Sequence, residues 1–175
     1  MEKNSYYPYY LPILLFVAML VDGHVSSAMM GMLSIPMTFT SHLVLLILMF
    51  STFKVNQTYL MICATVIGLL YDSYFYNVLG INLILLPILV FFMYRLFEYV
   101  EPNTLTLILS FIVFVTLMSI GRAVLLSIFK LTNANFLDFF TRNLAPSLLI
   151  NVLYICLLVI PLSKVYGVYK KKVII

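Results

Sequence analysis

The chain has 175 residues, of which 64% are hydrophobic and 9% charged, with a mean hydropathy of +1.13 and a formal net charge of +4. So little polar surface excludes a soluble domain of this length and indicates a polytopic membrane protein. Four of the ten basic residues lie between Lys164 and Lys172, so the positive charge forms no folded basic face and nucleic acid is not an expected partner.

Long, unbroken apolar runs predict an all-α membrane protein. About 20 apolar helical residues cross a bilayer core, and the backbone at that depth must form its hydrogen bonds internally. Strands of an outer-membrane barrel would instead alternate in polarity over about 10 residues. We expect one integral membrane domain over residues 1–175 with six spans, at about 10–28, 37–53, 59–75, 80–97, 105–129 and 144–166.

The basic residues predict the orientation of these spans, because Lys and Arg are enriched in short cytoplasmic loops. Six spans place both termini on one side of the membrane. With both termini in the cytoplasm, seven basic residues lie on the cytoplasmic side and two on the external side, and Arg122 is left within a span. The cytoplasmic set is Lys3, Lys54, Arg95, Lys164, Lys170, Lys171 and Lys172, and the external pair is Lys130 and Arg142.

Among the charged residues within the predicted spans, Arg95 and Lys164 lie near cytoplasmic ends. The other three lie in the half of the bilayer that this orientation makes external: Asp22, Asp72 and Arg122. By insertion scales, an Arg or Asp at the centre of a span costs about 2.5 to 3.5 kcal/mol, so such residues usually face the bundle interior and find partners. We therefore expect Arg122 to pair with one of the two aspartates.

Further polar residues are predicted at the same end of the bundle. His24 and His42 flank the first external loop, and Asn82 begins the fourth span. Two interpretations of this polar cluster stay open. It is either a packed network that gives the helices a specific arrangement or a polar pocket open to the outside.

Known chemistries of such residues do not fit this pattern. Two intramembrane aspartates suggest an aspartyl protease, but the presenilin type has Gly-x-Gly before one Asp, whereas Leu69-Leu70-Tyr71 precedes Asp72. Asp22 and His24 are two residues apart, which directs them about 200° apart on a helix and away from a shared metal. We expect no catalytic residue, no metal site and no cofactor.

The stretch from Gly68 to Asn82 resembles the rod shape-determining protein MreD family. That family carries Gly-Leu, two residues, Asp and then seven residues before Gly, and here Gly68, Leu69, Asp72 and Gly80 fall in that pattern. Near the end of the first span, Asp22-Gly23-His24-Val25-Ser26 resembles the Asp-x-His-x-Ser of some members, and Ser41-His42 opens the second span. We expect Gly68, Leu69 and Gly80 to shape the hairpin between the third and fourth spans.

This resemblance implies a non-enzymatic scaffold of the bacterial cell-elongation complex, located in the cytoplasmic membrane. It implies MreC as the partner and, indirectly, the transpeptidase and glycosyltransferase that build side-wall peptidoglycan, with membrane lipid around the bundle. It also implies a fold similar to the S-components of energy-coupling-factor vitamin transporters. The alternative function is a solute-binding S-component. Such subunits carry alanines four apart on the first span, whereas here Asp22 follows Ala18 at that spacing.

Overall fold

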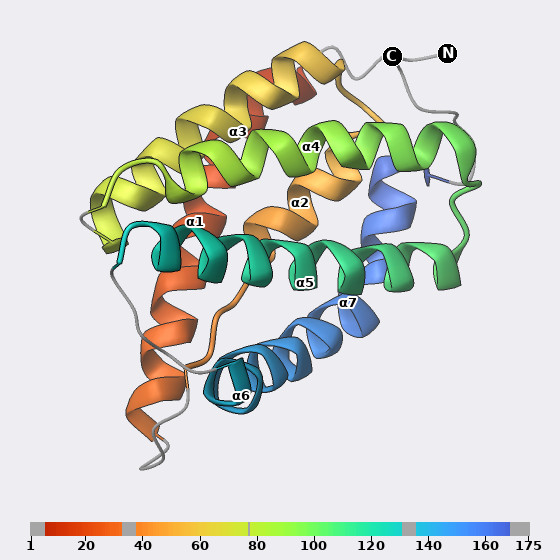
Figure 1. Cartoon of the computed structure of the whole chain (residues 1–175). Helices are drawn as coiled ribbons and strands as arrows, with labels where there is room; N and C mark the ends of the chain where they lie inside the picture. Colours follow the sequence, from red (N-terminus) through yellow and green to blue (C-terminus); the bar gives the residue numbers. More distant parts are fainter. Residues whose placement is uncertain (1–5, 33–37, 77, 131–135, 169–175) are drawn as a thin grey trace.

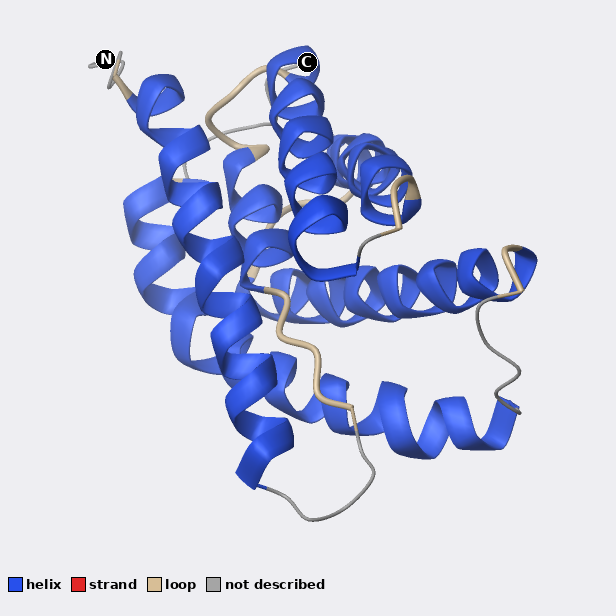
Figure 2. Ribbon diagram, turned by 90° about the vertical axis from the view of Figure 1, so that its left-hand side faces the viewer, coloured by secondary structure: helices blue, strands red, loops and turns tan. Residues whose placement is uncertain are grey.

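The computed structural model describes residues 6–32, 38–76, 78–130 and 136–168. No strand occurs in these ranges, which form helices joined by turns and loops (Figure 2). The predicted all-α class is therefore confirmed. By length and composition, five described helical segments are able to cross a membrane: Tyr7–Gly31, Gln57–Phe75, Ile81–Tyr99, Thr104–Ile128 and Phe140–Tyr166.

The helices follow the predicted spans closely except at the second one (Figure 1). Their order is α1 (Tyr7–Met32), α2 (Leu43–Ser51), α3 (Gln57–Tyr71) with its π-helical continuation η1 (Asp72–Tyr76), α4 (Ile81–Tyr99) and α5 (Thr104–Ile128). The chain then forms the short α6 (Phe136–Phe139), the π-helical η2 (Phe140–Leu144) and α7 (Ala145–Tyr166).

The prediction of a continuous second span over 37–53 is wrong. Only Leu43–Ser51 is α-helical, and nine residues rise about 14 Å, roughly half of a bilayer core. The residues from 38 to 42 have no regular structure and form the loop that enters the bundle before α2 (Figure 2). Side chains of other helices supply the hydrogen-bond partners of this loop, as described below.

Helix α2 lies at the centre of the bundle. It contacts α1, α3, α4, α5 and α7, and seven of its nine residues are buried. A helix that is apolar on all sides is stable only when neighbours cover its whole circumference. The short α2 is therefore the element around which the longer helices pack.

Helices α3 and α4 lie side by side (Figure 1), and Gly68 permits their close approach. A Cβ atom added at Gly68 would lie 2.6 Å from the carbonyl oxygen of Asn82 and 2.9 Å from Cα of Leu83. Both atoms belong to the backbone of α4, so a side-chain rotation cannot relieve the overlap. Small residues commonly allow such contacts between membrane helices.

The beginning of α1 and the end of α7 meet at one end of the bundle. The Tyr7 hydroxyl donates a hydrogen bond to the Tyr166 hydroxyl at 2.8 Å and is hydrogen-bonded to Ser51 Oγ at 2.9 Å. The Lys54 ammonium lies 4.9 Å and 5.1 Å from the centres of these two tyrosine rings, within the range of cation–π attraction. We call this the tyrosine end.

The contact at Gly68 predicts that Gly68→Ala lowers the free energy of unfolding by about 1 to 3 kcal/mol, the usual effect of overpacking. Gly31→Ala is the matched control, because a Cβ at Gly31 meets no atom within 4 Å. Unfolding is followed in detergent by the reaction of the buried Cys63 thiol with a maleimide dye. All variants carry Cys156→Ala, since Cys156 is exposed.

Equal unfolding curves for Gly68→Ala and Gly31→Ala would contradict the close packing of α3 on α4.

Candidate functional site

The Asp22 carboxylate of α1 caps the N-terminus of α2. It is 1% exposed and accepts hydrogen bonds from the backbone N–H groups of Leu43 at 2.8 Å and Val44 at 3.0 Å. The hydroxyls of Ser41 and Tyr71 also donate to it, the second at 3.3 Å. Asp22 is therefore the acceptor for the first turn of a helix that begins inside the bundle.

The loop before α2 is bonded in the same manner by side chains from distant parts of the chain. Irregular backbone at membrane depth is tolerated where protein groups satisfy it. Three consecutive backbone N–H groups each donate to a side chain: Thr40 to Ser147 Oγ at 3.1 Å, Ser41 to Ser26 Oγ at 3.1 Å and His42 to Asn151 Oδ1 at 2.9 Å. Asn151 Nδ2 donates in return to the carbonyl oxygen of Thr40 at 2.8 Å.

Asp72 does for α4 what Asp22 does for α2. It is fully buried, and its carboxylate accepts the backbone N–H groups of Gly80 at 2.9 Å, Asn82 at 2.9 Å and Leu83 at 3.1 Å. The Asn82 side-chain amide donates to it as well, at 2.8 Å. Gly80 precedes the helix with φ +114°, a backbone conformation that favours glycine.

Both sites place a carboxylate where a helix presents unpaired N–H groups. The first four N–H groups of a helix have no partner within the helix, and the helix dipole adds partial positive charge there. Hydrogen bonds to an ionised acceptor are about twice as strong as neutral ones. The N–H groups offset the desolvation of the acid, while the acid satisfies N–H groups that have no water to bond with.

Arg122 of α5 joins the Asp72 site through Asn82. Its guanidinium Nη2 donates to Asn82 Oδ1 at 3.2 Å, and the amide group of the same side chain donates to Asp72. The described contacts of Arg122 therefore reach Asp72 by way of an amide, where the sequence predicted a direct ion pair. Asn82 serves as acceptor for the cation and as donor to the acid.

Most of the predicted polar cluster converges. Asp22, His42, Asn82 and Arg122 line a void of about 10 Å³, close to the volume that one water molecule requires. The buried His42 ring has its Nδ1 atom 3.1 Å from the Thr40 carbonyl oxygen and 3.1 Å from Asn151 Nδ2.

His24 and Leu69 do not join this cluster. His24 is exposed on α1, because its two-residue separation from Asp22 directs it to the opposite face of the helix. Leu69 is 43% exposed, while its neighbour Gly68 faces α4. Within the predicted hairpin motif, Gly68 and Gly80 thus have contacts or conformations that require glycine, and Leu69 lies on the outer surface of the bundle.

Sequence reasoning did not assign a role to the hydroxyl groups that complete the site. Ser41, which the family resemblance included, and Tyr71, which nothing in the sequence singled out, both bond Asp22. Ser147 bonds the loop before α2. One signal was present, since Ser147 and Asn151 are four residues apart and therefore share one face of α7. Single hydroxyls in apolar segments carry no comparable signal.

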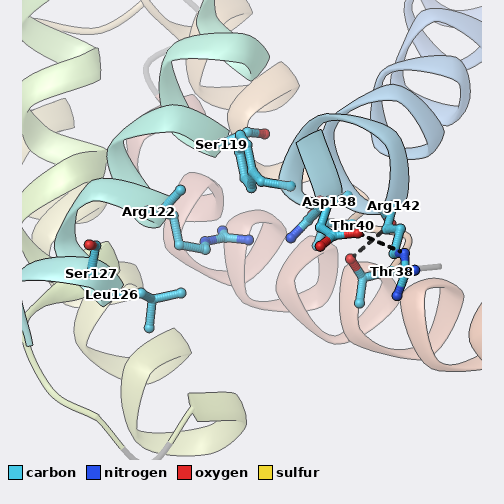
Figure 3. A pocket seen from close by; sticks show the side chains of 11 residues that line it. Thr38, Thr40, Ser119, Arg122, Leu126, Ser127, Asp138 and Arg142 are labelled. Atoms are coloured by element: carbon cyan, nitrogen blue, oxygen red, sulfur yellow. Dashed lines mark hydrogen bonds and ion pairs between the residues drawn. The ribbon is translucent and has the colours of Figure 1, made fainter. Parts of the chain in front are cut away.

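A larger cavity of about 400 Å³ lies between α5 and the segment formed by α6 and η2 (Figure 3). Arg122 extends from α5 into the cavity, and Arg142 lies on the opposite side of it. The Arg142 Nε atom is 3.3 Å from Asp138 Oδ1. The other lining residues are Thr38, Thr40, Ser119, Ala123, Leu126, Ser127, Phe139 and Asn143. Arg122 is thus shared between this cavity and the small void.

The family model of the rod shape-determining protein MreD matches residues 3–169. The chain belongs to the MreD family. The cell shape-determining protein MreD of Streptococcus pneumoniae (strain ATCC BAA-255 / R6) is 30% identical over 154 residues, which cover 88% of this chain and 93% of that protein. No solved structure matches the chain. The predicted resemblance to the MreD family is thereby confirmed, and MreD membership supports a role in cell shape.

The capping geometry predicts that Asp72→Ala lowers the free energy of unfolding by at least about 2 kcal/mol, because several buried N–H groups lose their acceptor. Asp72→Asn retains one acceptor oxygen and is expected to fall between the wild type and Asp72→Ala. Glu98→Ala is the control, since its carboxylate forms a solvent-accessible pair with Arg95 and such pairs contribute about 0 to 1 kcal/mol. Unfolding in detergent micelles measures all three variants.

If Asp72→Ala and Glu98→Ala have the same stability, the Asp72 cap does not hold α4. Should Asp72→Ala fail to accumulate in membranes, Asp72→Asn provides the comparison.

Proposed function

We propose that this protein is a non-enzymatic membrane scaffold of the bacterial cell-elongation complex, which maintains cell shape through side-wall peptidoglycan synthesis with MreC. Its membership of a cell shape-determining family supports this role. The non-enzymatic part of this proposal rests on how the two buried acids are hydrogen-bonded. Asp22 and Asp72 each accept several backbone and side-chain hydrogen bonds, which suits a structural role rather than proton transfer.

The architecture fits a scaffold because its centre is fixed from several sides. Helix α2 contacts five other helices, and its N-terminus and preceding loop are bonded to α1 and α7. A partner that packs against the outside of such a bundle meets a surface of defined shape. Binding then costs little ordering of the scaffold itself.

We further propose that the protein is a multi-pass protein of the cytoplasmic membrane with both termini in the cytoplasm. The hydrogen bond between Tyr7 and Tyr166 supports this, since it holds the start of α1 and the end of α7 at one end of the bundle. Lys54 and Lys164 belong to the same end, as the positive-inside rule requires of a cytoplasmic side. The two capped helix N-termini then lie toward the outside.

MreC is the proposed direct partner, bound by its single-pass membrane segment. The long helices offer exposed apolar stripes at helical spacing, which suit contact between helices. Examples are Ile13, Val17 and Val21 on α1, Leu109, Val113 and Leu117 on α5, and Leu149, Leu153 and Leu157 on α7. One stripe accommodates one membrane helix, and lipid covers the others. The transpeptidase and glycosyltransferase of wall synthesis associate indirectly, through MreC.

The second candidate function is that of a solute-binding S-component, whose fold we propose this bundle shares. The 400 Å³ cavity favours it, because it lies toward the proposed external side. The first helix argues against it. Ala18 is 6% exposed and Asp22 is 1% exposed, so this face of α1 packs inside the bundle and is not free to dock on a transporter partner.

The scaffold proposal predicts that MreC co-purifies with this protein and that exchanging only the membrane segment of MreC for an unrelated one abolishes co-purification. Cells that carry the exchanged MreC become round and lose localised wall synthesis, as do cells depleted of this protein. Labelled wall precursor and phase microscopy measure both effects.

Co-purification that survives the exchange would place the contact outside the membrane segment. Depleted cells that keep their shape but lose vitamin uptake would support the S-component function instead.

A further inference from the structure

We propose that the small void beside His42 binds one ordered water molecule, which donates a hydrogen bond to the Nε2 atom of that histidine. The inference rests on the tautomer of the ring, on the void that Nε2 faces and on the polar groups that line this void. Such a site goes beyond the scaffold role and does not depend on it.

The contacts of Asn151 determine which ring nitrogen of His42 carries the proton. Asn151 Oδ1 accepts the backbone N–H of His42 at 2.9 Å. Asn151 Nδ2 donates to the carbonyl oxygens of Thr40 at 2.8 Å and Ser147 at 2.7 Å. An amide nitrogen has two hydrogens, and both are used in these bonds. The Asn151 amide therefore has no hydrogen left for His42 Nδ1, which lies 3.1 Å from its nitrogen.

The ring proton of His42 is consequently on Nδ1. This atom lies 3.1 Å from the carbonyl oxygen of Thr40 and donates to it, because a carbonyl oxygen can accept two hydrogen bonds. The ring is buried, and burial disfavours a second proton, which would turn the imidazole into a cation. Nε2 is then an acceptor with an unshared electron pair.

The Nε2 atom faces the void, and no group of the described residues forms a hydrogen bond with it. His42 lines the void, whereas Thr40 and Asn151, which contact Nδ1, do not. The ring edge with Nδ1 is therefore turned away from the void, and Nε2 on the opposite edge is directed into it. A buried acceptor without a hydrogen bond is unfavourable, so a donor in the void stabilises this arrangement.

The lining of the void suits a single water molecule. Its volume of about 10 Å³ matches one water and admits no larger ligand. Asn82 and Arg122 line it beside His42. Asn82 Oδ1 accepts one hydrogen bond from Arg122 and has a second lone pair. One water molecule can thus donate to His42 Nε2 and to Asn82 Oδ1, and buried waters typically have about two to four polar partners.

The charges around the void favour a neutral ligand over an ion. Arg122 is bonded through Asn82 to the Asp72 carboxylate. The Asp22 carboxylate, which also lines the void, already accepts hydrogen bonds on both of its oxygens. Neither charge is left for an ion to balance, whereas water supplies the donor that His42 lacks.

A water at this position connects two parts of the polar network. On one side, His42 Nδ1 belongs to the loop before α2, which Asn151 joins to α7. On the other side, Asn82 joins Arg122 of α5 to the Asp72 cap of α4. The bound water therefore links the entry of the central helix to the capped N-terminus of α4.

The site is tested by solid-state NMR of the full chain in lipid bilayers, labelled with ¹⁵N at histidine only. The chain has two histidines, and the exposed His24 is the internal control, assigned with a His24→Gln sample. Nitrogen shifts separate protonated from unprotonated ring nitrogens, and dipolar transfer from water protons reports only immobilised water. We expect His42 to have a protonated Nδ1 and an unprotonated Nε2 that receives magnetisation from water.

Val44→Ile tests the void without changing charge, because Val44 lines it and the added carbon fills a space of this size. The variant is expected to lose the transfer from water to His42 Nε2 while Nδ1 stays protonated. Val124→Ile is the matched control, since it adds the same carbon at a half-exposed position of α5 that does not line the void. Its His42 signals are expected to equal those of the wild type.

A proton on His42 Nε2, or no transfer from water to that atom in the wild type, would overturn the proposal. Undiminished transfer in Val44→Ile would do the same. If Val44→Ile does not fold, the wild-type spectrum decides alone, because it reports both the tautomer and the bound water. The experiment uses no partner protein and no cell-shape readout, so its failure leaves the scaffold proposal unaffected.

Discussion

The capping of buried helix N-termini by aspartate is the interaction on which the rest of this structure depends. An apolar bundle offers no water to the first N–H groups of a helix that begins at depth, so protein groups must accept them. Asp22 provides this acceptor for α2, and Asp72 provides it for α4. Once both are in place, the short central α2 can contact the five longer helices, and Gly68 can bring α3 against the backbone of α4.

The two interpretations of the polar cluster correspond to two different places in the molecule. Asp22, His42, Asn82 and Arg122 surround a void of only about 10 Å³, so they form a packed network. The roomier cavity lies on the other side of Arg122 and is bordered by η2. Arg122 connects the network to the cavity, because it bonds Asn82 and also lines the larger space. A ligand at the cavity would therefore contact a residue that is bonded to the network capping α4.

The parts of the fold that could be predicted are those encoded locally. Apolar runs predicted five of the long helices, and the spacing of Gly68, Asp72 and Gly80 predicted the hairpin between α3 and α4. The broken second span could not be predicted, because its loop is bonded by Ser147 and Asn151, more than 100 residues away. Arg122 was expected to reach an acid directly, since charge alone does not reveal that an amide with both donor and acceptor groups lies between them.

The most direct measurement is amide hydrogen exchange at Leu43 and Val44 in the wild type and in Asp22→Ala, with the full chain in lipid nanodiscs. If the Asp22 carboxylate holds the N-terminus of α2, these amides exchange slowly in the wild type and about tenfold faster or more in the variant. Amides in the middle of α3, around Ala64, should exchange equally in both, because Asp22 does not bond them. Equal exchange at Leu43 and Val44 in the two proteins would show that the aspartate does not anchor the central helix.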